Sequence, residues 1–330
     1  MKPSILITRA VFPEILAQLE QHFDVDSNQE DRLLNTGELI TRLQGKDGVF
    51  TNMSEKYTEA VIAAAPRLKV ICNMAVGYNN IDVAAATAAG VMVTNTPDVL
   101  NETTADFGWA LLMATARRVT ESEHYLRAGL WKKFHYESFL GADVHGSTLG
   151  IIGMGRIGQA IARRSMGFDM QVIYHNRSRL EPALEARANN ARHVGREELL
   201  KSADHVMLVV PYSPPLHHMI GAAELAMMKP TATLVNIARG GIVDDAALVD
   251  ALARQQIAGA GLDVYENEPA LDQRFLGLKN VVLTPHIASA SRPTRIAMAT
   301  TAATNLIAAL AGRRPPNLLN PETDTAKRKA

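Results

Sequence analysis

The sequence has one cysteine, no excess of charge of either sign and no long apolar run, and each shortage excludes a class of protein. Cys72 alone cannot form an intramolecular disulfide, which indicates a reducing compartment. Thirty-four basic residues balance thirty-four acidic ones, so no global field attracts nucleic acid or an anionic membrane. No stretch approaches the roughly 20 apolar residues of a membrane span, and no signal sequence follows Met1. We therefore predict a cytoplasmic protein that binds neither nucleic acid nor membrane.

The 330 residues, 47% of them hydrophobic, are enough for two domains with full cores. Short apolar runs alternate with helical stretches in two series, which predicts an α/β fold with two doubly wound parallel sheets. The expected strands are Ile5–Ile7, Gly48–Phe50, Leu68–Ile71 and Val91–Val93 in the first series, and Thr148–Ile152, Gln171–Tyr174, His205–Val210, Ala232–Asn236, Ala258–Leu262 and Val281–Leu283 in the second.

Two long helical stretches suggest how the domains are connected. The Ala-, Leu- and Met-rich stretch 103–119 separates the two strand series and is expected to form one helix between domains. A second Ala-rich helix, expected at 294–311, follows the last strand and most economically returns to the first domain. We therefore predict a discontinuous, flavodoxin-like substrate domain of residues 1–100 and 288–330, into which a Rossmann dinucleotide-binding domain of residues 101–287 is inserted.

A glycine fingerprint opens the second series. Gly153, Gly155 and Gly158 follow an expected strand and begin a helix, which is the context that a dinucleotide site requires. The first glycine permits a tight turn, the second lets the backbone approach the pyrophosphate, and the third lets helix and strand pack closely. Amides at the helix N-terminus would then face the anion.

The residues that follow the next strand indicate which dinucleotide binds. A site for NAD would carry Asp or Glu about 20 residues after the glycines, but the chain reads Tyr-His-Asn-Arg-Ser-Arg from position 174. Asn176, Arg177 and Arg179 could instead hold a 2′-phosphate, since arginine pairs bidentately with phosphate. We predict that NADP(H) is preferred and that NAD(H) is possible; the alternative is that both arginines are solvated loop charges.

Three further residues, Arg239, Glu268 and His286, supply the groups that reduction of a 2-oxo acid needs. Arginine would anchor the carboxylate and stabilise charge on the carbonyl oxygen, histidine would donate the proton, and a neighbouring carboxylate would favour the charged imidazolium. Taken singly, each is more often a surface charge, a turn residue or a structural histidine. All three, however, follow expected strands, at the edge where open α/β sheets bind ligands. We predict that they form the catalytic site.

With these motifs the sequence resembles the D-isomer-specific 2-hydroxyacid dehydrogenase family, from about Leu68 to Pro321. In particular it is similar to the branch of glyoxylate/hydroxypyruvate reductases and 2-ketogluconate reductases. Together with the cofactor prediction above, the resemblance implies an NADPH-preferring reductase of glyoxylate, hydroxypyruvate or 2-keto-D-gluconate. It also implies a homodimer formed through the nucleotide domain, and the catalytic roles of Arg239, Glu268 and His286.

The resemblance implies further site residues. The segment from Asn73 to Asp82 matches the family's loop whose backbone amides, here those of Val76 and Gly77, hold the substrate carboxylate. Asp263 would bind the nicotinamide carboxamide. Leu100 and the loop from Trp131 to Leu140 either shape the substrate pocket or only pack. The implied cofactor contacts are Thr104, Arg156, Ile157, Pro211, Ala238 and Asp263.

Other interpretations remain open at this point. The substrate could be a phosphoglycerate- or lactate-type hydroxy acid, because motifs do not define the walls of a pocket. A non-enzymatic NAD(P)-sensing dimer of similar fold is a second class. No metal site is predicted: His217 and His218 are adjacent, so their side chains are expected to diverge, and no cluster at metal-ligand spacing surrounds them.

Overall fold

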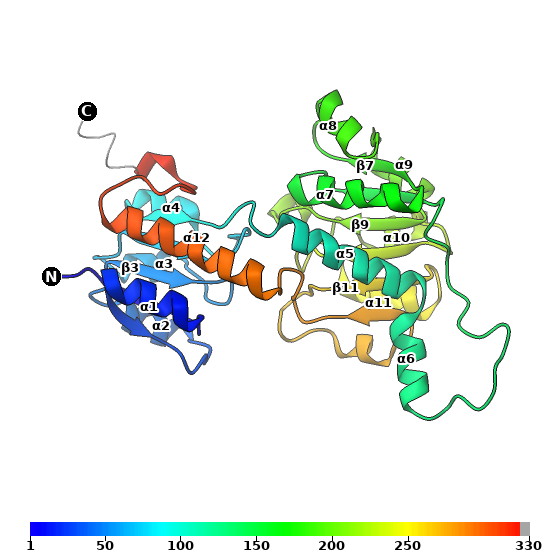
Figure 1. Cartoon of the computed structure of the whole chain (residues 1–330), viewed down its shortest axis with the longest axis horizontal. Coiled ribbons are helices and arrows are strands. Elements are labelled where there is room, and N and C mark those ends of the chain that lie inside the picture. The colour runs from blue at the N-terminus through cyan, green and yellow to red at the C-terminus, as the bar shows by residue number, and fades with distance from the viewer. Residues whose placement is uncertain (324–330) are drawn as a thin grey trace. The chain divides into compact units, whose positions relative to one another are not determined.

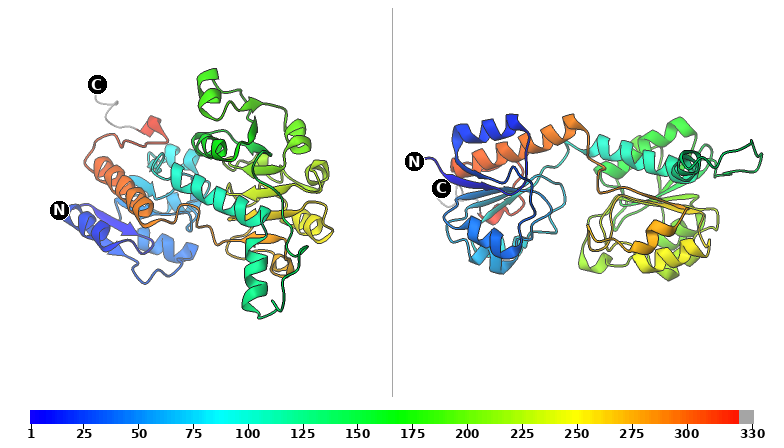
Figure 2. Two further views of the ribbon diagram at one scale, coloured as in Figure 1. Left: turned by 45° about the vertical axis from the view of Figure 1, so that its right-hand side comes forward. Right: turned by 90° about the horizontal axis from the view of Figure 1, so that it is seen from below.

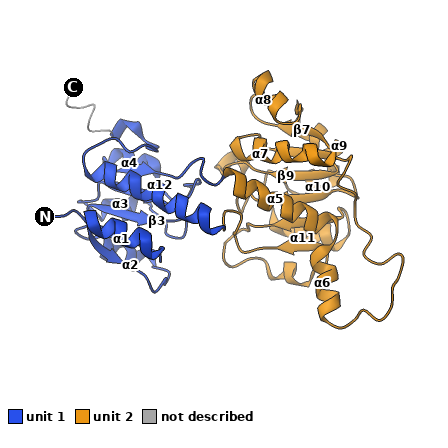
Figure 3. Cartoon of the chain, in the orientation of Figure 1, with its two compact units in different colours: residues 1–100, 291–330 blue, residues 101–290 orange. Residues whose placement is uncertain are grey.

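The computed structural model describes residues 1–323, and the chain divides into two compact units (Figure 3). Unit 1 comprises residues 1–100 and the segment from Ser291 onward, and unit 2 comprises Asn101–Ala290, so unit 2 interrupts unit 1 in the sequence. The second crossing falls after Ala290, whereas the sequence predicts it after residue 287. Ile287 and Ala288 belong to unit 2 because their amides donate to the carboxylate of Asp263.

Unit 1 contains a five-stranded parallel sheet in the order β2-β1-β3-β4-β5, which is the flavodoxin-like order. Helices α1 and α12 cover one face, while α2, α3 and α4 cover the other (Figure 1). The strands are β1 (Ser4–Ile7), β2 (Asp24–Ser27), β3 (Gly48–Thr51), β4 (Val70–Asn73) and β5 (Met92–Thr94). The helices are α1 (Pro13–His22), α2 (Thr36–Leu43), α3 (Glu59–Ala63), α4 (Val83–Ala88) and α12 (Arg292–Leu310).

Unit 2 contains a seven-stranded parallel sheet in the order β12-β11-β10-β9-β6-β7-β8. This is the Rossmann order with one strand added, and it reverses between β6 and β9. The strands are β6 (Thr148–Ile152), β7 (Gln171–His175), β8 (Arg192–His193), β9 (His205–Leu208), β10 (Thr233–Asn236), β11 (Gly259–Leu262) and β12 (Val281–Leu283).

Helices cover both faces of this second sheet (Figure 2). On one face, α5 (Asn101–Ala116) packs against α7 (Arg156–Arg164). The other face is covered by α9 (Arg196–Ser202), α10 (Ala222–Met227) and α11 (Asp245–Ala253). The remaining helices are α6 (Val119–Arg127) and α8 (Pro182–Arg187), with short 3₁₀ turns at Ser165–Phe168, Pro214–Leu216, Gln273–Gly277 and, in unit 1, Pro321–Thr323. No helix of residues 1–323 is long and apolar enough to cross a bilayer.

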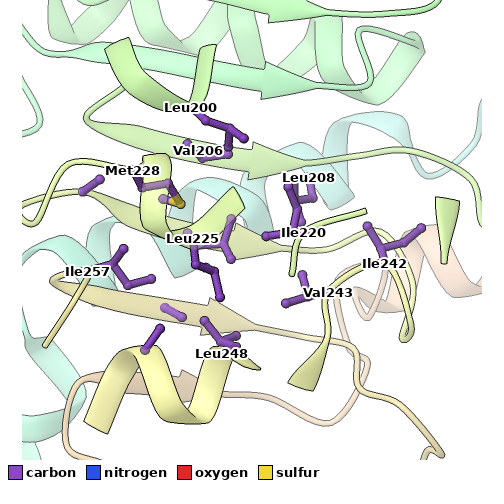
Figure 4. Close-up of a cluster of buried hydrophobic side chains, with 14 of the residues drawn as sticks. Leu200, Val206, Leu208, Ile220, Leu225, Met228, Ile242, Val243, Leu248 and Ile257 are labelled. Atoms are coloured by element: carbon purple, nitrogen blue, oxygen red, sulfur yellow. The ribbon is translucent and has the colours of Figure 1, made fainter. Parts of the chain in front are cut away.

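The cores lie between the sheets and their helices. The strands β9 and β10 are buried throughout, as expected for a parallel sheet with both faces covered. Figure 4 shows one cluster, in which Val206 and Leu208 of β9 pack with Leu225 of α10 and Leu248 of α11. Each such side chain contributes roughly 1.5–3 kcal/mol when it is fully buried. The loops at the strand ends are therefore attached to a rigid base.

Two details differ from the sequence prediction. The helix expected at 103–119 is present as α5, but it ends three residues earlier, at Ala116: Arg118 adopts a left-handed backbone (φ +52°), and a second helix begins at Val119. The sequence also misses β2, which reads Asp-Val-Asp-Ser, and the two-residue β8. Both are edge strands, where polar residues and short length are usual and leave no apolar pattern.

Candidate active site

The glycine loop joins β6 to α7 beside the point where the sheet order reverses. Gly153 has a left-handed φ of +104°, and a Cβ there would lie 2.6 Å from the carbonyl oxygen of Val209. A Cβ on Gly158 would lie 2.3 Å from the carbonyl oxygen of Gly153, so helix and turn pack too closely for any side chain. Gly155 is exposed with open space beside it. Together with the first turn of α7, which begins at Arg156 and Ile157, this is a shape that can hold a pyrophosphate.

Asn176 stands directly after β7 and fastens this loop. Its Oδ1 accepts a hydrogen bond from the Met154 amide at 2.7 Å. This bond uses only the side-chain oxygen, so the predicted contact of Asn176 with a 2′-phosphate, which would use Nδ2, stays a prediction.

The two arginines that follow have different surroundings. Arg179 forms a two-pronged ion pair with Glu185, with nitrogen–oxygen distances of 2.9 and 2.8 Å. Glu185 also accepts a hydrogen bond from the Tyr174 hydroxyl at 2.7 Å. Hydrogen bonds from Arg179 and Tyr174 lower the pKa of Glu185 to about 2. Arg177 is exposed and makes no hydrogen bond or ion pair with any residue in 1–323. Of the two cations, Arg177 is thus the one whose charge no neighbour neutralises.

The three predicted catalytic residues lie in one unit, in loops that leave three adjacent strands. Arg239 follows β10, Glu268 lies in the loop after β11, and His286 follows β12. The Nδ1 atom of His286 lies 2.8 Å from Oε2 of Glu268, whose Oε1 accepts a hydrogen bond from the Tyr265 amide at 2.9 Å. The carboxylate thus fixes the ring through Nδ1. Nε2 is the atom left to exchange a proton with a substrate.

The charges of the three residues support one another. Burial raises the pKa of Glu268, but the His286 hydrogen bond and charge, the Tyr265 amide and Arg239 lower it, and the net pKa lies below the ordinary value. Burial lowers the pKa of Arg239, and the negative charge of Glu268 opposes that shift. An arginine remains protonated under either influence. At neutral pH the site therefore holds a carboxylate that is hydrogen-bonded to His286 and attracted by the charge of Arg239.

Asp263, predicted to bind the cofactor, fastens the loop that carries His286. This carboxylate is 1% exposed and accepts hydrogen bonds from the Thr284 hydroxyl at 2.7 Å and from the Ile287 and Ala288 amides, both at 2.8 Å. A carboxylate has about four acceptor sites, and donors within unit 2 use three of them. His286 itself has a left-handed backbone (φ +54°), which these bonds on either side of it hold in place.

Two residues that the sequence did not single out hold the Arg239 turn. The Oδ1 of Asn236 accepts from the Ala238 amide at 3.0 Å, and its Nδ2 donates to the Arg239 carbonyl at 3.4 Å. A Cβ on Gly240 would lie 1.7 Å from the Tyr265 carbonyl oxygen, so the Arg239 turn packs directly on the loop that carries Glu268. Asn236 could have been found from the sequence, because an asparagine at the end of a strand commonly hydrogen-bonds to the backbone of the turn that follows.

The other predicted residues lie in several places. Ala238 is buried beside Arg239, and Pro211 is exposed just after β9, on the same side of the sheet as the glycine loop. Thr104 is buried near the start of α5. Val76 and Gly77 belong to unit 1, in the loop that follows β4.

One further cluster lies in unit 2. Among the described residues, His217, His218 and Glu266 form one group whose ligand atoms lie within 4.8 Å of one another. The two histidine rings stack at 3.9 Å, so the expectation that they diverge was wrong; His218 has a left-handed backbone (φ +53°). Parallel rings direct their lone pairs along separate planes, and Nε2 of His218 already contacts Glu266 at 2.7 Å. The cluster is thus a stacked pair of histidine rings, one of which contacts the carboxylate.

A parallel sheet with a glycine loop at its order reversal and a paired histidine and carboxylate at the same edge defines a nicotinamide-dependent dehydrogenase of 2-hydroxy acids. The sequence profile of "D-isomer specific 2-hydroxyacid dehydrogenase, NAD binding domain" matches residues 109–288. The chain belongs to the D-isomer-specific 2-hydroxyacid dehydrogenase family, as the sequence resemblance predicted.

Individual relatives agree over the full length. The chain is 48% identical to a glyoxylate reductase of Thermococcus gammatolerans, covering 99% of both chains. It is 43% identical to the solved TT0316 protein of Thermus thermophilus, with a TM-score of 0.88 and coverage of 96% and 99%. An NADPH-dependent glyoxylate/hydroxypyruvate reductase of Sinorhizobium meliloti, solved with NADP and malonate, is 34% identical with a TM-score of 0.87 over 98% of each chain.

Proposed function

We propose that the protein reduces 2-oxo acids to D-2-hydroxy acids, with NADPH as the preferred reductant. The observation that carries the proposal is the 2.8 Å pair of His286 and Glu268, on adjacent strand ends of the sheet that bears the glycine loop. A histidine whose Nδ1 is bound to a carboxylate is oriented to donate a proton from Nε2.

Each residue has a defined part in this reaction. A nicotinamide cofactor bound at the glycine loop would supply the hydride that the carbonyl carbon of the 2-oxo acid accepts. His286 donates the Nε2 proton to the carbonyl oxygen, so that the hydroxyl forms without a free alkoxide. Glu268 stabilises the imidazolium before transfer and holds the ring after it. Arg239 orients the carboxylate and stabilises the developing charge on oxygen, while the amides of Val76 and Gly77 are the predicted further ligands of the carboxylate.

For the substrate we propose glyoxylate first, and hydroxypyruvate and 2-keto-D-gluconate as further candidates. Full-length relatives at 48% identity are glyoxylate reductases, and the Sinorhizobium meliloti neighbour acts on glyoxylate and hydroxypyruvate. Phosphoglycerate- or lactate-type acids are the alternative within the same chemistry. Turnover of any of them would exclude the purely sensing role.

The preference for NADPH is proposed from Arg177. This exposed cation follows β7, where an NAD site would carry an acid, and Arg179 beside it is already paired with Glu185. The Sinorhizobium meliloti neighbour, whose structure contains NADP, supports the same choice. NAD(H) remains a possible second cofactor.

A homodimer is proposed through α6 and the segment that follows it. No residue of α6 is buried, and beyond it Trp131, Phe134 and Tyr136 are 61%, 78% and 89% exposed. Apolar side chains gathered in this way on a surface indicate a protein interface. Light scattering should give twice the monomer mass, and the double variant Trp131→Ser with Phe134→Ser should have a lower mass. A monomeric wild type would refute the proposal.

A cytoplasmic location stays a prediction of the sequence.

The deciding experiment is an initial-rate assay of the purified chain with NADPH and separately NADH, against glyoxylate, hydroxypyruvate, 2-keto-D-gluconate, 3-phosphohydroxypyruvate and pyruvate. We expect turnover with glyoxylate and a higher kcat/KM with NADPH than with NADH. Absence of turnover with every acid would overturn the proposal and favour a sensing role. A higher kcat/KM with NADH would leave the reaction standing and refute the assignment of Arg177.

A further inference from the structure

The loop after β4 has three successive backbone carbonyls that all accept hydrogen bonds. The Ala75 oxygen accepts from the Thr96 amide at 3.0 Å. The Val76 oxygen accepts from Nδ2 of Asn95 at 2.9 Å, and the Gly77 oxygen accepts from Nδ2 of Asn73 at 2.7 Å. The donors stand at or just after the ends of β4 and β5, which pair side by side. All three carbonyls are therefore drawn toward one edge of the sheet.

The direction of the carbonyls fixes the direction of the amides. In a trans peptide the N–H points opposite to the C=O of the same plane. The amides that share planes with these carbonyls belong to Val76, Gly77 and Tyr78, so they face away from the sheet edge. None of the three donates a hydrogen bond to any atom in residues 1–323, and all three residues are at least partly exposed. Successive amides that face one way form a concave site for an anion.

We propose that Asn73 and Asn95 are positioning residues which turn the amides of Val76, Gly77 and Tyr78 outward to bind the substrate carboxylate. The inference rests on the proposed function and adds to it a third amide donor, that of Tyr78, and the two side chains that orient the set.

Asparagine suits this task for electrostatic reasons. Asn73 is 0% and Asn95 7% exposed, so both are built into the unit. An amide NH₂ donates to a carbonyl without a net charge, whereas a carboxylate in its place could not donate and would repel the bound anion. The backbone of Asn95 is held in turn, since its carbonyl oxygen accepts from Nδ2 of Asn305 in α12 at 3.2 Å.

The first test uses the kinetics of Asn95→Asp and Asn95→Ala with glyoxylate and NADPH. Losing one orienting hydrogen bond, worth about 1 kcal/mol, should raise KM for glyoxylate roughly five- to tenfold in Asn95→Ala and further in Asn95→Asp. KM for NADPH should not change, and kcat should change less than KM.

Asn320→Ala is the matched control. Asn320 is 3% exposed and also donates from Nδ2 to a backbone carbonyl of unit 1, that of Val91, at 2.9 Å. Its side chain also donates to the Thr87 hydroxyl at 3.0 Å and accepts from the Val93 amide at 2.8 Å. Asn320→Ala should therefore lower the melting temperature at least as much as Asn95→Ala does, yet leave KM for glyoxylate unchanged. An equal rise of KM in the control, or an unchanged KM in both Asn95 variants, would overturn the inference.

The second test does not need turnover. In ¹⁵N-labelled full-length protein saturated with NADP⁺, oxalate should shift the amide signals of Val76, Gly77 and Tyr78, and the shifts should weaken in Asn95→Asp. If the wild type reduces no 2-oxo acid but these amides respond to oxalate, the proposed reaction fails and the anion site stands. If it reduces glyoxylate and these amides do not respond, the reaction stands and the anion site fails.

Discussion

Two loops, one in each unit, are held at the carboxyl edge of a parallel sheet by opposite kinds of side chain. In unit 2 the carboxylate of Asp263 accepts from the Ile287 and Ala288 amides, which draws backbone donors inward. In unit 1 the neutral side-chain amides of Asn73 and Asn95 donate to backbone carbonyls, so the backbone N–H groups of that loop point outward. The first arrangement presents a side chain, the imidazole of His286, and the second presents the backbone itself.

This difference matches the chemistry proposed for each loop. A proton donor needs a fixed ring and a negative partner, and Glu268 and Asp263 supply both in unit 2. A carboxylate ligand needs several donors and no negative charge beside it, which buried asparagines supply in unit 1. The following changes test whether the two kinds of support are as different as the structure indicates.

The largest effect is expected from His286→Ala, which removes the proton donor and leaves its supports in place. The value of kcat should fall by roughly 10²–10⁴-fold, the usual contribution of general acid catalysis. Because His286 is not part of the glycine loop, the Kd for NADPH, measured by fluorescence titration, should stay within about twofold. Retained turnover would show that another group donates the proton.

Asp263→Asn tests whether the loop that carries His286 needs a carboxylate. It replaces that carboxylate with a neutral amide, the kind of side chain that holds the loop after β4 in unit 1. The asparagine keeps one acceptor but turns an NH₂ group toward amides that are themselves donors, so at least one buried donor loses its partner. We expect a loss of about 1–3 kcal/mol in the free energy of unfolding. Since His286 also loses its fixed position, kcat should fall roughly 10–100-fold. Urea unfolding and steady-state kinetics measure the two effects.

Asp263→Ala is a useful companion to that variant. It removes the carboxylate without adding a donor, so its effect on kcat separates loss of position from electrostatic conflict. If Asp263→Asn had wild-type kcat and stability, neutral amides could support either loop, and the contrast between the two units would not hold.

Much of this arrangement follows from the sequence, and the remainder depends on contacts that no local pattern contains. The alternation of apolar runs with helical stretches predicts the parallel strands, because buried strands are apolar throughout. The spacing of the glycines predicts the βα turn at the nucleotide site. The placement of Arg239, Glu268 and His286 at one edge of the sheet was predictable because all three follow strands. The roles of Asn95 and Asp263 as supports were not, since each depends on which backbone group a neighbouring strand end brings within 3 Å. The contact of Asn73 with the Gly77 carbonyl is local, but it depends on the path of the loop, which no residue pattern specified. For the same reason the sequence could not show that Arg179 is paired with Glu185.

The smallest effect is expected at the two arginines after β7. They offer a comparison of the same kind, because Arg179 is paired with Glu185 and Arg177 has no ion pair within residues 1–323. Arg177→Ala should lower kcat/KM for NADPH roughly 10-fold, the equivalent of one charged hydrogen bond of about 1.5 kcal/mol, and should leave kcat/KM for NADH unchanged. Arg179→Ala should instead lower the melting temperature, because it leaves Glu185 and Tyr174 without their cation. If Arg179→Ala alone reduced the NADPH preference, the paired arginine would be the one that reads the phosphate. The neutralisation of Arg179 by Glu185 would then have to be broken when the cofactor binds.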